Sequence, residues 1–408
     1  MANPIDGKNI LLGVTGSIAA YKAADLASKL TQNGAVVDVI MTPAALKFIT
    51  PLTFQSVTTR KAFTDDDLWG GEGHVRHIGL GMAGDLLVIA PASANTIAKL
   101  AHGIADSLLT VTALAARCPI MIAPAMDGGM FENPATQANL EILRQRGFIV
   151  IGPAEGHMAS GLVGLGRMVE PSELLGQIRW HLAKEGPLSK VRVMVTAGGT
   201  QEPIDPVRMI TNRSSGKQGY ALARAALDEG AEVTLVHTPT NLVLPIGAAE
   251  TLVHTAQEMA DAVLKYADQT DILIMAAAVA DFKPVSKADQ KIKKDSGFSN
   301  IQLEPTMDIL KALAEKRVHG KNPKVVIGFA AESQELLQNA SKKLAAKKLE
   351  MIVANDISAR DAGFSVDTNR VTLLFADGRS KEFLLLTKEA AAIEIVKEAV
   401  VLYQKIQH

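Results

Sequence analysis

Residues 184–200, with the sequence KEGPLSKVRVMVTAGGT, decide the organisation of the chain, because one domain ends and another begins within them. The run VRVMV at 191–195 has the composition and length of a buried strand, and the glycine turn AGGT at 197–200 follows it. We therefore predict a first domain over residues 1–188 and a second over residues 189–408.

The start of the chain repeats this pattern. An apolar run at 10–14 leads into TGS at 15–17, and a helical pattern covers 18–30. A glycine turn between strand and helix lets backbone N–H groups approach a phosphate, and the helix N-terminus favours negative charge. Gly16 and Ser17 are therefore candidates for a phosphate site, as is the second glycine turn. Neither turn is a complete G-x-G-x-x-G, and tight packing explains such a glycine equally well.

Composition narrows the class of protein. The chain has 408 residues, 48% of them hydrophobic, which is enough for two cores of ordinary size. A formal net charge of −1 argues against a broad nucleic-acid-binding surface, and no apolar run predicts a membrane span. The N-terminus lacks the apolar segment of a signal peptide, and a single cysteine, Cys118, excludes an internal disulfide or a cysteine metal cluster. We expect a cytoplasmic protein that acts on small molecules, with Cys118 as a buried structural thiol.

Small and polar residues follow the predicted strands of the first half, at the sheet edge where ligands bind in open α/β folds. Ser107 begins a second helical run and is a candidate for its N-cap. Two loops add further groups: GGEGHVRH at 70–77 contains His74 and His77, and the glycine-rich segment 156–167, a candidate lid, contains Ser160. The strand-end candidates are Thr42 after residues 36–41, Ser93 and Asn95 after residues 86–90, and Asp127 after residues 120–123.

The second half alternates in the same way, with helical patterns at 216–229 and 255–266 and strands at 232–236 and 272–275. The predicted fold class is therefore α/β, with two doubly wound, mainly parallel-sheet (Rossmann-like) domains in series. After residue 275, three alanines leave room for a flat nucleotide base, and Asp281 follows as a group able to bind ribose hydroxyls or a metal. A tightly packed apolar strand end is an equally good reading of these residues.

Lysines gather at 291–294 and on a predicted helix over 335–348, where Lys343 and Lys347 are i, i+4 neighbours. Such a run is usually a solvated face. Like charges on adjacent turns repel, however, and a bound triphosphate would relieve that repulsion. The predicted hairpin over 370–386 and the closing helix over 390–406 carry no chemistry that their residues reveal.

Several motifs, in a fixed order, carry a resemblance to known families. The first half is similar to the homo-oligomeric flavin-containing cysteine decarboxylases. The whole chain resembles the bifunctional bacterial coenzyme A biosynthesis enzymes, in which phosphopantothenoylcysteine decarboxylase is fused to phosphopantothenate–cysteine ligase. The motifs are GVTGSIAAYK (13–22), the His77 segment, APASAN (90–95), PAMD (124–127), GRM (166–168), TNRSSG (211–216), AAAVADF (276–282), KIKK (291–294) and GFAAE (328–332).

The resemblance implies two activities and their cofactors. The ligase half would join cysteine to 4′-phosphopantothenate through an acyl-cytidylate made from CTP, with Mg²⁺ on the triphosphate. The decarboxylase half would then use FMN to convert phosphopantothenoylcysteine to 4′-phosphopantetheine. The family also implies a homo-oligomer, with trimeric contacts in the first half and dimeric contacts in the second.

The resemblance also assigns residues. His77 is the implied catalytic histidine, Asn212 the contact to the acyl-cytidylate, and Lys291 the group that stabilises developing charge; a protein metal ligand stays unknown, with Asp281 as a candidate. The implied FMN residues are Gly16, Ser17, Thr42, Ser93, Asn95 and Ser107. The implied CTP residues are Ala277, Asp281, Lys291, Met307, Asp308, Ile309, Leu310, Phe329, Lys343 and Lys347.

Two positions depart from the family pattern. Asp127 stands where asparagine is usual, and Ser160 replaces the lid cysteine that protonates the intermediate. Because a hydroxyl is a much weaker acid than a thiol, one interpretation moves the acid function from Ser160 to Asp127 or another group. The alternative is an active ligase fused to an FMN-binding regulatory or oligomerisation module.

Overall fold

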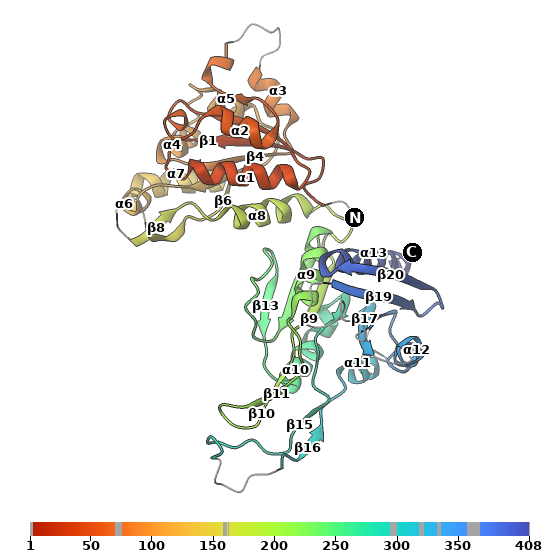
Figure 1. Cartoon of the computed structure of the whole chain (residues 1–408). Helices are drawn as coiled ribbons and strands as arrows, with labels where there is room; N and C mark the ends of the chain where they lie inside the picture. The colour runs from red at the N-terminus through yellow and green to blue at the C-terminus, as the bar shows by residue number, and fades with distance from the viewer. Residues whose placement is uncertain are drawn as a thin grey trace. The chain divides into compact units, whose positions relative to one another are not determined.

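The computed structural model describes residues 3–69, 76–157, 161, 163–293, 300–317, 322–332, 336–356 and 368–407 (Figure 1). Contacts divide the chain into two compact units, Ala2–Leu182 and Ala183–His408. Each unit contains a predominantly parallel sheet with helices on both faces, which confirms the predicted fold class.

The sheet of the first unit has the strand order β3-β2-β1-β4-β5-β6, and all of its pairs are parallel. The order reverses beside β1, which is the point where doubly wound sheets bind ligands. A separate antiparallel hairpin, β7–β8, follows the sheet. The strands are β1 (Asn9–Val14), β2 (Val36–Met41), β3 (Ala62–Phe63), β4 (Leu86–Ala92), β5 (Ile120–Pro124), β6 (Ile149–Val150), β7 (Ala154–His157) and β8 (Val163–Arg167).

Alternation along β1 explains why both faces of this sheet are covered. Ile10 and Leu12 belong to the buried cluster that includes α1, α2 and α8, whereas Leu11 belongs to the cluster with α3, α4, α5 and α7. The helices are α1 (Ala20–Gln32), α2 (Pro51–Thr58), α3 (Arg76–Ala83), α4 (Ala94–His102), α5 (Leu108–Ala115), α6 (Gly128–Glu132), α7 (Pro134–Gln145) and α8 (Pro171–Ala183), with 3₁₀ turns η1 (Ala45–Lys47) and η2 (Asp65–Asp67).

Two local predictions in this unit need correction. The segment after Thr42 forms the single turn η1 instead of a full helix, because Pro51 starts a new helix only a few residues later. The glycine-rich segment expected as a loop is largely the β7–β8 hairpin, in which Gly156 pairs with Gly164. Ser160 lies outside the described residues.

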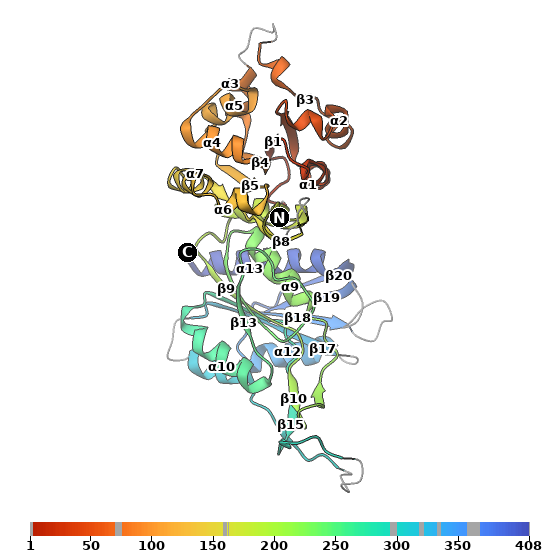
Figure 2. The ribbon, with the colours of Figure 1, turned by 90° about the vertical axis from the view of Figure 1, so that its left-hand side faces the viewer.

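The second unit has the sheet order β13-β12-β9-β14-β17-β18-β19-β20, parallel except at the last two pairs (Figure 2). Two short antiparallel pairs, β10–β11 and β15–β16, lie apart from this sheet. The strands are β9 (Arg192–Ala197), β10 (Gln201–Pro203), β11 (Met209–Thr211), β12 (Glu232–His237), β13 (Ala249–Leu252), β14 (Ile272–Met275), β15 (Phe282–Pro284), β16 (Leu303–Pro305), β17 (Val325–Glu332), β18 (Met351–Asp356), β19 (Thr368–Phe375) and β20 (Ser380–Thr387).

Helices cover this sheet on both faces. Side chains of α9 and α13 join one buried cluster, and side chains of α10, α11 and α12 join the other. The predicted hairpin and closing helix are confirmed as β19–β20 and α13, with Gly378 at positive φ in the turn. The helices are α9 (Lys217–Asp228), α10 (Ala256–Tyr266), α11 (Ile309–Arg317), α12 (Leu336–Ala346) and α13 (Lys388–Gln407), with the 3₁₀ turn η3 (Ala267–Gln269).

Candidate active sites

The first unit contains a cavity of about 580 Å³ at the carboxyl edge of its sheet. Segments after β1, β4 and β5 line it, and the β7–β8 hairpin borders it through His157 and the end of β8. Four predicted residues lie there, namely Gly16, Ser17, Ser93 and Asp127. The other lining residues are Ile18, Ala19, Tyr21, Lys22, Ala94, Ala125, Met126, Met130, Gly166, Arg167 and Met168.

Gly16, in the turn after β1, lines the cavity and is packed closely against Ala44. A Cβ at Gly16 would lie 2.5 Å from the Cβ of Ala44, so no larger residue fits without a shift. Ser17 Oγ accepts a hydrogen bond from the backbone N–H of Ala19 at 3.2 Å, just before α1 begins. This combination of a glycine turn, a hydroxyl and a helix N-terminus suits an anionic group.

Lys22 was missed by the sequence analysis as a separate site residue, although it belongs to the first motif. Its side chain is nearly buried, and its Nζ donates to the Met168 carbonyl at 3.0 Å and to Glu170 Oε1 at 2.7 Å. Arg167 also contacts Glu170, at 3.2 Å. These bonds fix the segment after β8 to α1, and they place positive charge beside the cavity.

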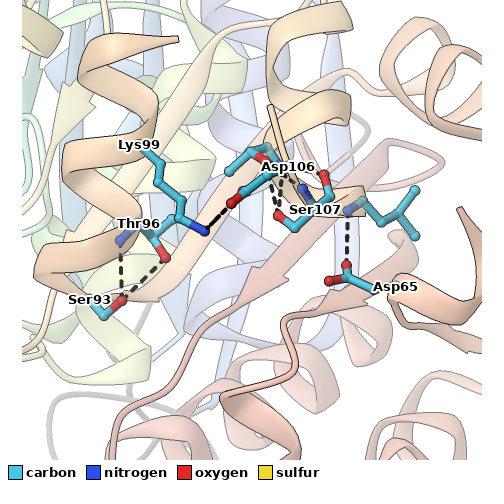
Figure 3. A network of polar contacts seen from close by, with 8 residues as sticks. Asp65, Ser93, Thr96, Lys99, Asp106 and Ser107 are labelled. Atoms are coloured by element: carbon cyan, nitrogen blue, oxygen red, sulfur yellow. Dashed lines mark hydrogen bonds and ion pairs between the residues drawn. The ribbon is translucent and has the colours of Figure 1, made fainter. Parts of the chain in front are cut away.

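Ser93 and Ser107 have similar local roles but different positions (Figure 3). Each hydroxyl caps a helix: Ser93 Oγ accepts from Thr96 N at 3.4 Å, and Ser107 Oγ accepts from Thr110 N at 3.3 Å. Ser93 lines the cavity, whereas Ser107 is buried and does not. A cap explains Ser107 without a ligand.

Thr42 and Asn95 also lie outside the lining of this cavity. The Thr42 hydroxyl is engaged locally: it accepts from Ala45 N at 3.3 Å and donates to the Val14 carbonyl at 3.4 Å. Asn95 is exposed in the first turn of α4. Among the six residues assigned to FMN by resemblance, the structure therefore brings together Gly16, Ser17 and Ser93.

The predicted catalytic groups of this half are not gathered in one place. Asp127 lines the cavity and caps α6, where its Oδ1 accepts from Gly129 N at 3.0 Å. His77 lies on α3, which packs against α5, and does not line the cavity; its Nδ1 is buried and has no hydrogen-bond partner within the described part of the chain. Both His74 and Ser160 are outside the described residues.

Cys118 was predicted to be a buried structural thiol, and the structure buries it only in part. It packs with the cluster that contains α4 and α5. Burial raises the pKa of its thiol, so the reactive thiolate is disfavoured near neutral pH.

We predict that Ser107→Ala lowers the stability of the first unit by about 1–2 kcal/mol and leaves flavin affinity within twofold of wild type. The loss follows from removal of the α5 cap, which a thermal unfolding transition measures. Ser56→Ala, at an exposed position of α2, is the matched control. A loss of flavin affinity without a change in stability would instead identify Ser107 as a ligand.

The second unit contains a cavity of about 630 Å³ at the carboxyl edge of its sheet. It gathers Asn212 and nine of the ten residues assigned to CTP by resemblance: Ala277, Asp281, Met307, Asp308, Ile309, Leu310, Phe329, Lys343 and Lys347. The remaining lining residues are Arg213, Ser214, Ser215, Gly216, Lys217, Gln218, Gly219, Met275, Ala276, Ala278, Val279, Ala280, Thr306, Asn355, Asn369 and Lys388.

The charges and shapes in this cavity suit a nucleotide. Its lining carries five cationic side chains against two acidic ones, Asp281 and Asp308, so the site favours a polyanion. The alanines after β14 and Phe329 supply an apolar wall of small and flat groups. Lys347 Nζ lies 3.1 Å from Asp308 Oδ2, an ion pair that joins the end of α12 to the segment before α11.

The glycine turn at Gly198 and Gly199 supports the cavity from outside. Gly198 has φ of +89°, and a Cβ there would lie 2.0 Å from Thr238 Oγ1. Its carbonyl accepts from Ala278 N at 2.8 Å, and Thr200 Oγ1 accepts from Ala280 N at 2.8 Å. The tight-packing alternative therefore describes this turn, and the segment 214–219, which opens α9, lines the cavity instead.

Asn212 and Lys291, assigned to the same reaction, lie in different places. Asn212 Nδ2 donates to the carbonyls of Ala278 and Val279, at 3.3 and 3.1 Å. Lys291 is exposed and does not line the cavity. The next residue, Ile292, donates its N–H to Asp205 Oδ2 at 3.1 Å and accepts from Arg208 at 2.7 Å, which holds this segment near β10–β11.

The end of the chain contributes two residues that lie next to the segments 370–386 and 390–406, in which the sequence analysis found no chemistry. Asn369, in β19, and Lys388, the first residue of α13, both line the cavity. No motif marks either residue. The one signal in the sequence was that Lys388 is a charged residue at the start of an otherwise apolar helical face. Within the described part, no three histidine, cysteine or acidic side chains are placed to hold a metal ion.

Comparison with known proteins adds the family. The flavoprotein family matches residues 2–182, and the family described as the DNA/pantothenate metabolism flavoprotein C-terminal domain matches residues 188–402. Among similar proteins, the coenzyme A biosynthesis bifunctional protein CoaBC of Bacillus subtilis (strain 168) is 47% identical over 397 residues, 97% of each chain. That of Mycobacterium tuberculosis (strain ATCC 25618 / H37Rv) is 43% identical over 402 residues, 95% of each chain. A solved C-terminal domain of a CoaBC protein is 40% identical, covers 54% of this chain and all of that one, and has a TM-score of 0.46.

The two cavities and the two family matches define a flavoprotein domain fused to a pantothenate-metabolism domain. The chain belongs to the family of bifunctional coenzyme A biosynthesis proteins, as its motifs predicted. None of the helices in the described ranges is long and apolar enough to cross a membrane.

Proposed function

We propose that residues 189–408 ligate cysteine to 4′-phosphopantothenate with CTP, and that residues 1–188 decarboxylate the product with FMN to give 4′-phosphopantetheine. The observation that carries the proposal is the convergence of Asn212 with nine of ten assigned nucleotide residues on one cationic cavity. Residues from segments more than 100 positions apart meet there. The family match to both halves supports the pair of activities.

In the ligase site, a carboxylate oxygen of 4′-phosphopantothenate attacks the α-phosphorus of CTP, and the α–β P–O bond breaks to release pyrophosphate. The amine of cysteine then attacks the acyl carbon and releases CMP. Lys343 and Lys347 bind the triphosphate, which carries Mg²⁺. The alanine segment and Phe329 receive the base, and Asp281 binds the ribose. Asn212 holds the alanine segment and contacts the activated intermediate.

In the decarboxylase site, FMN supplies the oxidation that makes loss of CO₂ possible. The chain fits it: Gly16 and Ser17 offer a glycine turn and a hydroxyl to the phosphate, and the small and methionine side chains of the cavity accept a flat ring. Lys22 and Glu170 hold the segment after β8 against α1, which closes one side. Asp127 borders the cavity as the candidate proton donor in place of the absent cysteine. His77 is assigned from the family motif alone.

A single coupled assay tests both activities. Purified protein is incubated with 4′-phosphopantothenate, cysteine and CTP, and pyrophosphate, CO₂ and the products are followed by mass spectrometry. We expect the wild-type protein to release pyrophosphate, to release CO₂ and to form saturated 4′-phosphopantetheine as the final product. The variant His77→Asn should release no CO₂. Pyrophosphate and phosphopantothenoylcysteine without any CO₂ would leave only the ligase and reject the decarboxylase assignment.

We predict that Asn212→Asp still releases pyrophosphate at a rate within about tenfold of wild type but transfers to cysteine at least about 100-fold more slowly. The carboxylate cannot donate to the carbonyls of Ala278 and Val279, so the wall that holds the intermediate shifts. A quenched reaction without cysteine should accumulate the acyl-cytidylate. Asn241→Asp, at an exposed position in the same unit, is the control. Normal cysteine transfer in Asn212→Asp would remove Asn212 from the mechanism.

A further inference from the structure

Lys388 is a buried lysine in an unusual position. It is 5% exposed, it lines the ligase cavity, and it is the first residue of the 20-residue helix α13. Lysine is rarely buried to this degree, and the positive end of a helix is an unfavourable place for a cation. Lys388 is one of the five cationic side chains that line this cavity and together favour an anionic ligand there.

Hydrogen bonds fix Lys388 to the start of a second helix. Gln218, in the first turn of α9, donates its Nε2 to the Lys388 carbonyl at 3.3 Å and accepts from Asn369 Nδ2 at 3.0 Å on its Oε1. The N-termini of α9 and α13 therefore meet at one wall of the cavity, where α9 and α13 run side by side (Figure 2). We call Gln218, Asn369 and Lys388 the carboxamide–lysine wall.

One buried polar atom of the cavity lining makes no hydrogen bond to the described residues. Asn355 lines the same cavity, and its Oδ1 is buried with no hydrogen-bond partner among the described residues. Exchange of the oxygen and nitrogen of a carboxamide preserves its shape, so this side chain can present either an acceptor or two donors to a ligand. An unsatisfied buried amide in a cavity points to a polar group of the substrate.

The wall and the assigned triphosphate lysines come from opposite faces of the sheet. Lys343 and Lys347 belong to α12 and its end, on the face with α10 and α11, whereas α9 and α13 cover the other face. Cations that approach the sheet edge from both faces can share a chain of phosphates, which is longer than a single phosphate group. The triphosphate of a nucleotide is such a chain.

We propose that Lys388 binds the terminal phosphates of CTP, the part that leaves as pyrophosphate, and that Gln218 and Asn369 position it. This inference rests on the proposed ligase function and adds a residue from the end of the chain to that site. As the α–β bond breaks, negative charge grows on the leaving pyrophosphate, and a fixed cation beside it stabilises that change.

Ligand binding to the full chain tests the inference. We expect Lys388→Gln to lower the affinity for CTP and for inorganic pyrophosphate at least about 10-fold, which is the contribution of one charge-assisted contact. The affinity for CMP should change by less than twofold, because CMP lacks the terminal phosphates. Lys405→Gln removes the same charge from an exposed position of α13 and should change none of the three. The differential between CTP and CMP is a readout that a purely structural role would not move.

Three results would overturn the inference. They are an equal loss of affinity for CTP and CMP, no loss of affinity for either, or a raised KM for 4′-phosphopantothenate with an unchanged affinity for CTP. If Lys388→Gln does not fold, Gln218→Glu is measured instead. This variant places a carboxylate in the same wall and should lower the affinity for CTP but not for CMP. Unchanged CTP affinity in Gln218→Glu would likewise count against it. Failure of the proposed function is distinguishable, because the wild-type protein would then show no CTP-dependent ligation at all.

Discussion

Ser17→Asp is expected to give a colourless protein that binds added FMN about 1,000-fold more weakly than wild type, while Ser17→Ala stays yellow. Ser17 lines the cavity at the start of α1, where the phosphate is assigned. At about 4 Å, two unit charges near a protein surface repel by about 4 kcal/mol. Aspartate can accept from Ala19 N as the serine does, so the turn should fold unchanged.

Flavin absorbance of the purified variants and fluorescence titration with FMN measure this effect. Ser56→Asp introduces the same charge at an exposed position of α2 and should remain yellow. Gly16→Asp is a less clean test, because its Cβ would collide with Ala44 as well as repel the phosphate. A yellow Ser17→Asp protein of normal affinity would contradict the phosphate placement.

The double change Lys343→Gln with Lys347→Gln is expected to lower kcat/KM for CTP by about 1,000-fold. Both lysines line the ligase cavity, and each charge-assisted contact to a phosphate contributes roughly 2 kcal/mol. The ion pair with Asp308 orients Lys347 toward the segment that borders the cavity. The salt dependence of CTP binding should also weaken, since two counter-charges are lost.

Steady-state kinetics with varied CTP, at two ionic strengths, would measure this loss. Lys342→Gln is the matched control, because Lys342 neighbours Lys343 on α12 and is exposed like it, but does not line the cavity. An equal effect of Lys342→Gln would mean that the general charge of the helix, and not a specific contact, attracts the nucleotide.

Local pattern was enough to predict much of the fold. The runs at 191–195, 232–236 and 272–275 correspond to β9, β12 and β14. A short hydrophobic run that ends in a turn indicates a buried strand by its own residues, without knowledge of the rest of the fold. The short pairs β10–β11 and β15–β16 were missed. Each of these strands has only three residues, and its pairing depends on a partner strand that no local pattern identifies.

The candidate sites divide in the same way. Thr42 and Ser93 look alike in sequence, each a hydroxyl directly after a strand, yet only Ser93 lines the cavity, because the Thr42 hydroxyl bonds Val14 and Ala45. The two lysine groups also look alike, yet Lys343 and Lys347 line the ligase cavity and Lys291 does not. Residue type and spacing indicate which side chains can take part in binding or catalysis. Tertiary packing decides which of these side chains line a cavity.

The fold class and the family could be predicted from motifs and hydrophobic periodicity, because these are properties of short segments. The motifs also led to nine residues that line the cavity of the second unit, as assignments to CTP by resemblance. No motif indicated that Gln218, at the start of α9, shares one wall with Asn369 and Lys388 from the end of the chain; tertiary packing brings them together. The antiparallel β19–β20 hairpin returns the chain to the sheet edge, and burial of the apolar face of α13 against α9 places Lys388 there. Such a contact depends on the packing energy of the whole domain, which no single segment of the sequence contains.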